Sequence, residues 1–128
     1  MTKIFAHRGA SAYAPENTME AFELAAKQGA DGIELDVHVT KDGEVVVTHD
    51  EKIERVSNGS GFVKDMTLRE LKRLSFHNHM ESYVGAGIPT LREVLEFVKT
   101  TTMAVNIELK TGLYWYPNIE EKTVALVH

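Results

Sequence analysis

Hydrophobic and polar side chains alternate strictly in two segments of the chain, residues 33–39 (IELDVHV) and residues 105–110 (VNIELK). An alternation with a period of two predicts a β-strand with one apolar face and one polar face. The polar positions are Glu34, Asp36 and His38 in the first segment and Asn106, Glu108 and Lys110 in the second. Each of these predicted strands therefore carries charged side chains on a single face.

A hairpin is expected after the first alternating strand. Asp42-Gly43 is the strongest short hairpin signal, and residues 45–50 (VVVTHD) are predicted to form the returning strand. If this dipeptide forms the centre of a two-residue turn, Asp36 faces His49 with Cβ atoms about 5 Å apart. The hairpin alone leaves two interpretations open: a polar face turned toward solvent, or a carboxylate and an imidazole brought together for chemistry.

The remaining pattern predicts helices between the strands. Asn17, with Glu20 three residues later, resembles a capping box and indicates a helix that ends near Gly29. Two amphipathic helices are expected over residues 67–74 and 90–98, because each segment begins with a Thr that can cap it. A short strand at the beginning of the chain completes an alternating order that indicates an α/β fold.

Composition narrows the functional classes. The 128 residues are 43% hydrophobic, carry a formal net charge of −5 and include no Cys. Without Cys, a disulfide framework and a thiolate metal site are excluded. Basic residues form no stripe, which makes nucleic acid an unexpected partner. No segment is apolar enough for a leader peptide or a membrane span, and we expect a cytoplasmic protein.

Acidic side chains on the predicted strands suggest a metal site. Glu34 and Asp36 lie two positions apart on one strand face, and Glu108 can add a third carboxylate from the second strand. Like charges this close are unfavourable unless one is protonated or a cation lies between them. Ligands that are all oxygen suit a hard ion such as Mg²⁺ or Ca²⁺.

The tetrapeptide AHRG places His7 and Arg8 at the end of the first predicted strand, before Gly9, which permits a sharp exit. Strand ends that face loops are where α/β folds place catalytic groups, and an arginine fork can bind phosphate. A structural interpretation is equally open, in which His7 caps the strand and Arg8 pairs with Glu34 or Asp36.

Three further features are interpreted as structural. The letters FHNHM match part of a nuclease motif, but no strand and helix frame surrounds them, and a polar loop is expected. The YWY triplet after the last strand is either a core anchor or a wall for an apolar or polyol ligand, and the anchor is preferred. Asn17 is assigned to helix capping.

The motifs HRG, PENT, ELDV, KDG, HD and NIELK, in that order, resemble the glycerophosphodiester phosphodiesterases. The resemblance also covers RVSNGSG and IPTLREVL, and so extends over nearly the whole chain. It implies a (β/α)8 barrel with a small helical insertion, which would correspond to residues 51–102. A complete barrel needs roughly 250 residues, so residues 1–128 are expected to form the N-terminal half.

The resemblance also implies roles for particular residues. Glu34, Asp36 and Glu108 would be the ligands of a divalent cation, either Mg²⁺ or Ca²⁺. The catalytic histidines would be His7 and His49, and the phosphate-binding residues would be Arg8 and Lys110. The implied reaction is hydrolysis of a glycerophosphodiester to glycerol 3-phosphate and an alcohol, with attack by the glycerol hydroxyl through a cyclic phosphate as one route.

Two alternative functions stay open. One is a lysophospholipase D-like phosphodiesterase, with the YWY loop as the candidate acyl-chain contact. The other is a non-catalytic fragment that binds a phosphoester or a protein. Because an incomplete barrel leaves a sheet edge exposed, another chain or the missing C-terminal half is expected to cover that edge.

Overall fold

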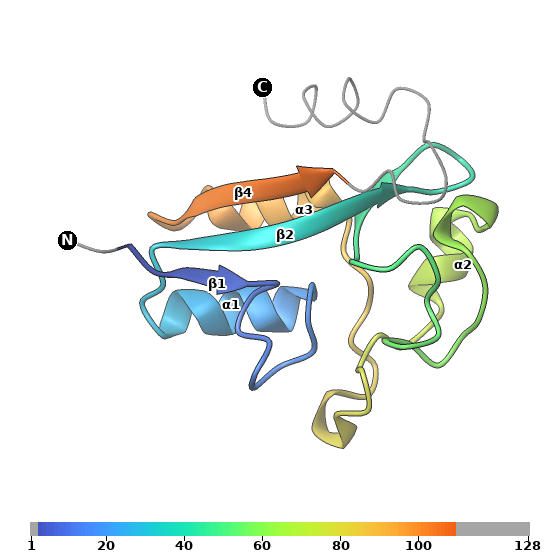
Figure 1. Cartoon of the computed structure of the whole chain (residues 1–128), viewed down its shortest axis with the longest axis horizontal. Helices are drawn as coiled ribbons and strands as arrows, with labels where there is room; N and C mark the ends of the chain where they lie inside the picture. Colours follow the sequence, from blue (N-terminus) through green and yellow to red (C-terminus); the bar gives the residue numbers. More distant parts are fainter. Residues whose placement is uncertain (1–2, 110–128) are drawn as a thin grey trace.

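The structure is a computed structural model, and it describes residues 3–109. Two helices, α1 and α3, cover one face of a small sheet, and loops with short helices lie beside it (Figure 1). The strands are β1 (Phe5–His7), β2 (Gly32–Val39), β3 (Val45–Val47) and β4 (Ala104–Leu109). The helices are α1 (Met19–Lys27), α2 (Leu68–Lys72) and α3 (Leu91–Val98), with 3-10 turns η1 (Val63–Asp65) and η2 (Glu81–Tyr83).

Strand β2 is the centre of the sheet. β1 and β4 both pair with it in parallel, and β3 pairs antiparallel with its C-terminal part. Helix α1 connects β1 to β2, and α3 precedes β4, so both parallel connections pass through a helix. This repeated strand–helix–strand order is the building unit of a (β/α)8 barrel, and it agrees with the predicted fold class.

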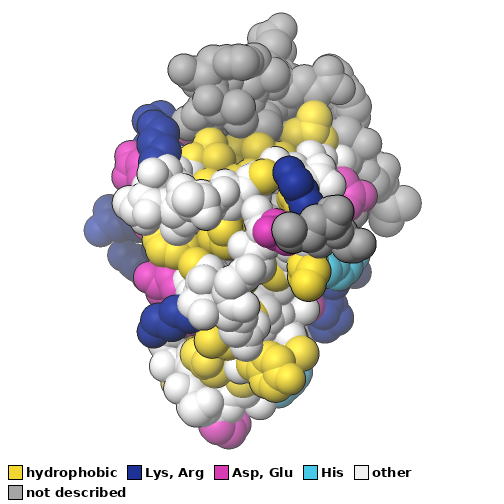
Figure 2. All heavy atoms as spheres, turned by 90° about the vertical axis from the view of Figure 1, so that its left-hand side faces the viewer, with side chains coloured by type: hydrophobic (Ala, Val, Ile, Leu, Met, Phe, Trp, Pro, Cys, Tyr) yellow, Lys and Arg dark blue, Asp and Glu magenta, His cyan; other side chains and the backbone are white. Residues whose placement is uncertain are grey.

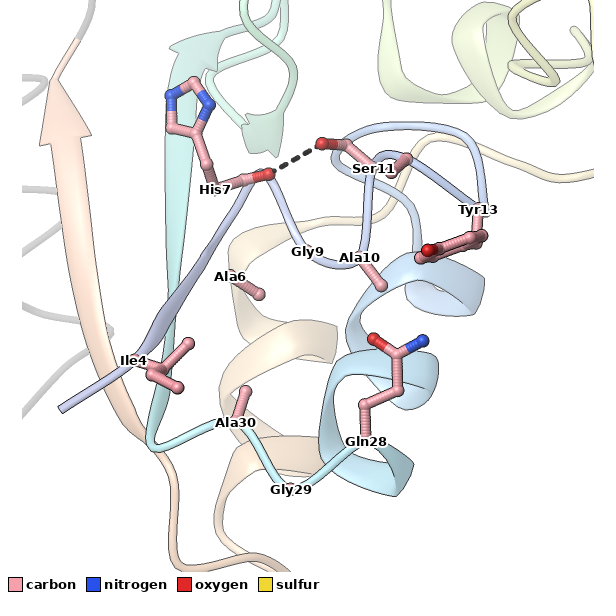
Figure 3. Close-up of a pocket in the computed structure, with 11 residues that line it drawn as sticks. Ile4, Ala6, His7, Gly9, Ala10, Ser11, Tyr13, Gln28, Gly29 and Ala30 are labelled. Carbon is pink, nitrogen blue, oxygen red and sulfur yellow. Dashed lines mark hydrogen bonds between the residues drawn. The ribbon is translucent and has the colours of Figure 1, made fainter.

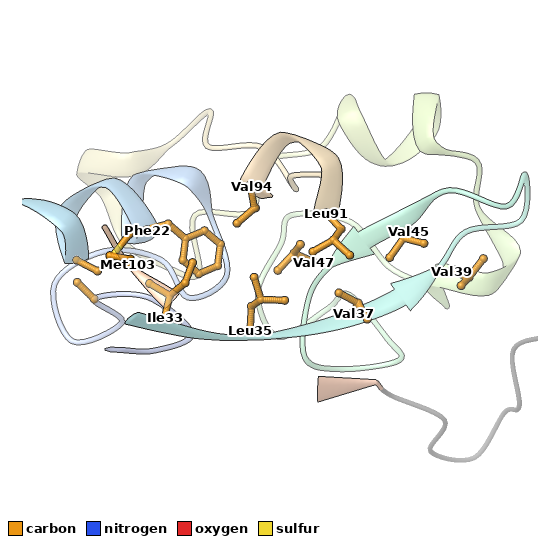
Figure 4. Close-up of a cluster of buried hydrophobic side chains, with 12 residues drawn as sticks. Phe22, Ile33, Leu35, Val37, Val39, Val45, Val47, Leu91, Val94 and Met103 are labelled. Carbon is orange, nitrogen blue, oxygen red and sulfur yellow. The ribbon is translucent and has the colours of Figure 1, made fainter. Parts of the chain in front are cut away.

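The apolar face of β2 packs against the two helices (Figure 4). Ile33 and Leu35 are fully buried, and they share a core with Phe22 of α1 and with Leu91 and Val94 of α3. On β4 the apolar positions are partly buried against the same core, as the alternation predicts. The polar positions of β2 and β4 consequently lie on the other face of the sheet.

A second, smaller core lies under the segment between β3 and α3. Its fully buried members include Ile53, Val63 and Leu71, and Val46 of β3 joins it to the sheet. Leu71 comes from α2, so this core fixes the short helices and loops that follow the hairpin. Among residues 3–109, no helix is long and apolar enough to cross a membrane.

The helix beginnings at Thr67 and Thr90 are confirmed. Each hydroxyl accepts a hydrogen bond from the backbone N–H of a glutamate three residues later, and that glutamate's carboxylate accepts one from the threonine N–H. These are complete capping boxes. The predicted cap of α1 is wrong, because Thr18 caps that helix and accepts from the Ala21 N–H at 3.2 Å.

Asn17 precedes the cap and has a φ of 55°. Asparagine tolerates this left-handed region better than most residues. Its Nδ2 donates to Asp36 Oδ2 at 3.0 Å, so Asn17 contacts an acidic side chain of β2.

The predicted hairpin register is wrong by one residue. His38 pairs with Val46, where a two-residue turn would have placed it opposite Val47. The turn is longer than expected: Thr40 N–H donates to the Glu44 carbonyl oxygen, and Gly43 takes a φ of 86° between them. A three-residue loop that ends in a left-handed glycine shifts the returning strand by one position.

Candidate active site

Strand register brings three carboxylates together. Asp36 of β2 and Glu108 of β4 are direct partners in the parallel ladder, and Glu34 lies two positions before Asp36 on the same face. One oxygen atom from each of the three carboxylates lies within 4.8 Å of the others. The sequence predicted this grouping from alternation, and parallel pairing supplies the register that the sequence could not give.

The carboxylates are crowded and partly removed from water. The Asp36 side chain is 1% exposed and that of Glu34 is 15% exposed. Burial raises the pKa of Glu34, and the negative charge of neighbouring Asp36 raises it further. Glu34 Oε1 is buried and accepts no hydrogen bond from the described residues. An all-oxygen cluster with a buried, unsatisfied carboxylate oxygen fits a hard divalent cation.

His7 and Arg8 lie at the C-terminal end of β1, beside this cluster. His7 pairs with Glu34 in the ladder, and its Nε2 is 3.5 Å from Glu34 Oε1. Arg8 has a φ of 57°, and Gly9 follows with a φ of 79°. A Cβ on Gly9 would lie 2.8 Å from the backbone of Ala21, so the sharp exit that the sequence predicts requires glycine here.

The Arg8 guanidinium lies between two acidic side chains. Its Nε is 3.5 Å from Asp36 Oδ2, and its Nη1 donates to Glu16 Oε2 at 3.1 Å. The structural alternative for this residue, a pairing with Asp36, is therefore present in the structure. A guanidinium held beside the carboxylate cluster is also well placed to contact an anion bound there.

His49 follows β3 and does not face Asp36 as the predicted register required. Its Nδ1 is 2.7 Å from Asp50 Oδ1. The buried His38 donates from Nε2 to the His49 carbonyl oxygen at 2.9 Å, which anchors the backbone of His49 to β2. His49 is thus fixed at its backbone by one neighbour and at its ring by another.

Three residues to which sequence reasoning gave no role in the site contact predicted site residues: Glu16, Asn17 and Asp50. Arg55 contacts two of these three, Asp50 and Glu16. The carboxylate beside His49 could have been found from adjacency in the sequence. The contact between Arg55 and Glu16 could not, because 39 positions separate them.

Lys110 and the YWY triplet lie outside the described residues. The segment FHNHM forms loop structure, and His77 Nδ1 lies 2.7 Å from Ser75 Oγ, which agrees with the predicted polar loop.

A largely apolar groove of about 340 Å³ lies beside His7. It is formed by β1, the loop that follows β1 and the segment that follows α1, with Ile4 and Ala30 near one end and Tyr13 near the other (Figure 3). Ser11 Oγ donates to the His7 carbonyl oxygen at 3.0 Å and so holds the loop against the end of β1 (Figure 3). Among residues 3–109, β1 pairs with no strand other than β2.

The family model of the glycerophosphoryl diester phosphodiesterases matches residues 7–126. The chain belongs to this family. The resemblance that the motifs predicted is therefore confirmed, and the family match covers every residue assigned a role above.

Relatives of this family have the same sequence pattern over nearly the whole chain. A glycerophosphodiester phosphodiesterase of Caldanaerobacter subterraneus subsp. tengcongensis is 51% identical over 127 residues, which is 98% of this chain and 52% of the relative. One from Bacillus altitudinis is 56% identical over 124 residues, 95% of this chain and 51% of the relative. The chain thus spans about half the length of the curated relatives it matches.

Solved structures of the family share the fold. A glycerophosphodiester phosphodiesterase from Agrobacterium tumefaciens matches with a TM-score of 0.88 and 44% identity, covering 99% of this chain and 52% of that one. An Oleispira antarctica phosphodiesterase in complex with the product sn-glycerol-3-phosphate matches with a TM-score of 0.86 and 36% identity, over 99% and 50% of the two chains. The prediction of part of a (β/α)8 barrel is confirmed.

Proposed function

We propose that this chain carries the metal- and phosphate-binding part of an enzyme that hydrolyses glycerophosphodiesters to glycerol 3-phosphate and an alcohol. The observation that carries the proposal is the convergence of Glu34, Asp36 and Glu108, with oxygen atoms within 4.8 Å of one another, beside His7 and Arg8. Family membership supports the reaction class, and the product bound to the Oleispira relative supports the substrate class.

The three carboxylates are the proposed ligands of Mg²⁺ or Ca²⁺. When bound, the cation supplies positive charge that offsets the carboxylates and stabilises negative charge on the phosphate. The raised pKa of Glu34 supports this assignment, because burial and the charge of Asp36 make its ionised form costly until a cation is present.

The basic residues are the proposed phosphate and proton-transfer groups. Arg8 and Lys110 bind phosphate oxygens and act most strongly where charge builds up in the transition state. His7 and His49 divide the two proton transfers: one accepts a proton from the attacking hydroxyl, and the other donates one to the departing alcohol. Attack by the glycerol hydroxyl is one route: the new P–O bond closes a cyclic phosphate as the alcohol leaves, and water then breaks one P–O bond of the ring to give glycerol 3-phosphate.

The helical insertion is proposed to end earlier than residue 102. Leu91 and Val94 of α3 pack in the sheet core, whereas the second core takes its members from Val46 to Ile88. In this proposal α3 is a helix of the barrel, and the insertion lies between β3 and Thr90.

The groove beside β1 is the proposed contact for the remainder of the barrel. Ile4 at its edge is 67% exposed and Tyr13 is 69% exposed. Hydrophobic side chains also gather on the face at which β1 begins (Figure 2). A C-terminal half, or another chain, would cover these side chains and the edge of β1. A cytoplasmic location stays a prediction.

The test is release of glycerol 3-phosphate from glycerophosphocholine, measured with Mg²⁺, with Ca²⁺ and with a chelator. We expect turnover that requires one of the two ions. Release of choline from lysophosphatidylcholine at a higher kcat/KM than from glycerophosphocholine would favour the lysophospholipase D-like alternative. Folded protein that binds glycerol 3-phosphate without any turnover would instead support the non-catalytic fragment.

A further inference from the structure

Arg55, in the loop after β3, binds two carboxylates with both sides of its guanidinium. Nε donates to Asp50 Oδ2 at 2.8 Å and Nη2 to Asp50 Oδ1 at 3.2 Å. Nη1 donates to Glu16 Oε1 at 2.7 Å and Nη2 to Glu16 Oε2 at 3.1 Å. Two bidentate contacts on one side chain fix its plane as well as its position.

Each of these carboxylates in turn contacts a residue of the proposed site. Asp50 Oδ1 lies 2.7 Å from His49 Nδ1, and Glu16 Oε2 accepts from Arg8 Nη1 at 3.1 Å. Arg55 therefore stands at the centre of a chain of contacts that runs from the end of β1 to the end of β3. The contacts cross between segments that are 39 positions apart in the sequence.

The contact with Asp50 determines which nitrogen of the neutral His49 ring carries the proton. The hydrogen bond from Arg55 is the main cause that lowers the pKa of Asp50 to about 2. Burial would raise the pKa of Glu16, but hydrogen bonds and charge from Arg55 and Arg8 lower it overall. Because ionised Asp50 can only accept, the hydrogen between it and His49 belongs to Nδ1. In the neutral ring, Nε2 then holds the free lone pair.

We propose that Arg55 is a positioning residue that fixes His49 through Asp50 and Arg8 through Glu16. The catalytic consequence of this positioning rests on the proposed function, whereas the effect on the His49 ring does not. Lysine is a poor substitute, because a single ammonium group cannot reproduce two bidentate contacts.

The first test is the tautomer of neutral His49, read from its imidazole ¹⁵N resonances in the whole chain. The His49→Gln variant assigns the signal among the 6 histidines. We expect the Nδ1–H form to dominate in the wild-type protein, to be lost in Asp50→Asn, and to lose population in Arg55→Gln. Arg69→Gln, which removes an exposed arginine of α2, is the matched control and should match wild type. An unchanged His49 tautomer in Arg55→Gln overturns the proposal.

The second test is kcat/KM for glycerophosphocholine. Loss of an outer-shell partner of a metal ligand typically costs about 10–100-fold in affinity or activity. We expect a loss of similar size for Arg55→Gln, a smaller loss for Arg55→Lys and no loss for Arg69→Gln. A kcat/KM equal to wild type in Arg55→Gln also overturns the proposal. If wild type shows no turnover, the proposed function fails and the tautomer measurement still decides the role of Arg55. If circular dichroism shows that Arg55→Gln is unfolded, the His49 tautomer and kcat/KM of Arg55→Lys decide instead.

Discussion

At the scale of single residues, the sequence indicated which side chains carry chemistry better than it indicated their contacts. Glu34 and Asp36 could be paired from their spacing alone, because alternation along a strand is a local property. Asn17 was assigned to helix capping, yet Thr18 caps α1 and the Asn17 amide binds Asp36. A short amide side chain suits both helix capping and a hydrogen bond to a carboxylate, and the sequence alone does not distinguish the two roles.

Asp50 provides a prediction about stability. Its pKa is lowered to about 2, with the Arg55 hydrogen bond as the main cause. A carboxyl group whose pKa is lowered by folding stabilises the folded protein at pH values above its ordinary pKa, near 3.8. This contribution disappears as the pH falls toward the folded-state pKa of about 2. At pH 6, Asp50→Asn should reduce the free energy of unfolding by roughly 1–2 kcal/mol.

Urea unfolding of wild type and Asp50→Asn at several pH values measures this difference. We expect the two proteins to converge between about pH 4 and pH 2, where the carboxylate becomes protonated in the folded state as well. A difference that stays constant down to pH 2 would show that the charge of Asp50 contributes nothing.

At the scale of elements, local sequence signals correctly predicted where two helices begin, but they gave the wrong register for the hairpin of β2 and β3. Thr67 and Thr90 were correctly assigned as caps, because a capping box involves only four consecutive residues. The hairpin register was wrong because Asp42-Gly43 lies in a three-residue loop rather than a two-residue turn. The pairing of β2 with β4 had no local signal, since these strands are far apart in the sequence.

Helix α3 offers a test of the cap. Thr90 Oγ1 accepts from the Glu93 N–H at 3.1 Å, and the Glu93 carboxylate accepts from the Thr90 N–H at 2.8 Å. Thr90→Ala should lower the free energy of unfolding by about 1 kcal/mol, whereas Thr90→Ser should keep most of it. Equal stabilities of the alanine and serine variants in urea unfolding would count against a cap at this position.

At the scale of the whole molecule, residues 3–109 include three parallel strands of a barrel, β1, β2 and β4, and a cluster of three carboxylates on β2 and β4. The order of strands and helices was predictable from the hydrophobic pattern. The candidate site depends on two features that the pattern lacks: the parallel register of β2 with β4, which places the carboxylates, and the loop after β3, whose Asp50 contacts His49.

The exposed apolar surface at β1 predicts self-association of the isolated chain. Ile4 is 67% exposed beside the groove, and Val84, which directly follows η2, is 61% exposed. Sedimentation velocity should show concentration-dependent association that Ile4→Lys reduces and Val84→Lys does not. A monomer at all concentrations, or an equal effect of both variants, would argue against the β1 edge as the contact surface.

The most direct test of the central claim is the initial rate of glycerol 3-phosphate release as a function of divalent-cation concentration. Wild type, Asp36→Asn and the exposed control Glu44→Gln are compared in one experiment. Cation stabilisation of the transition state amounts to several kcal/mol, so Asp36→Asn should be slower by at least about 100-fold at saturating cation. Glu44→Gln should match wild type. Cation-dependent turnover that survives unchanged in Asp36→Asn would contradict the account.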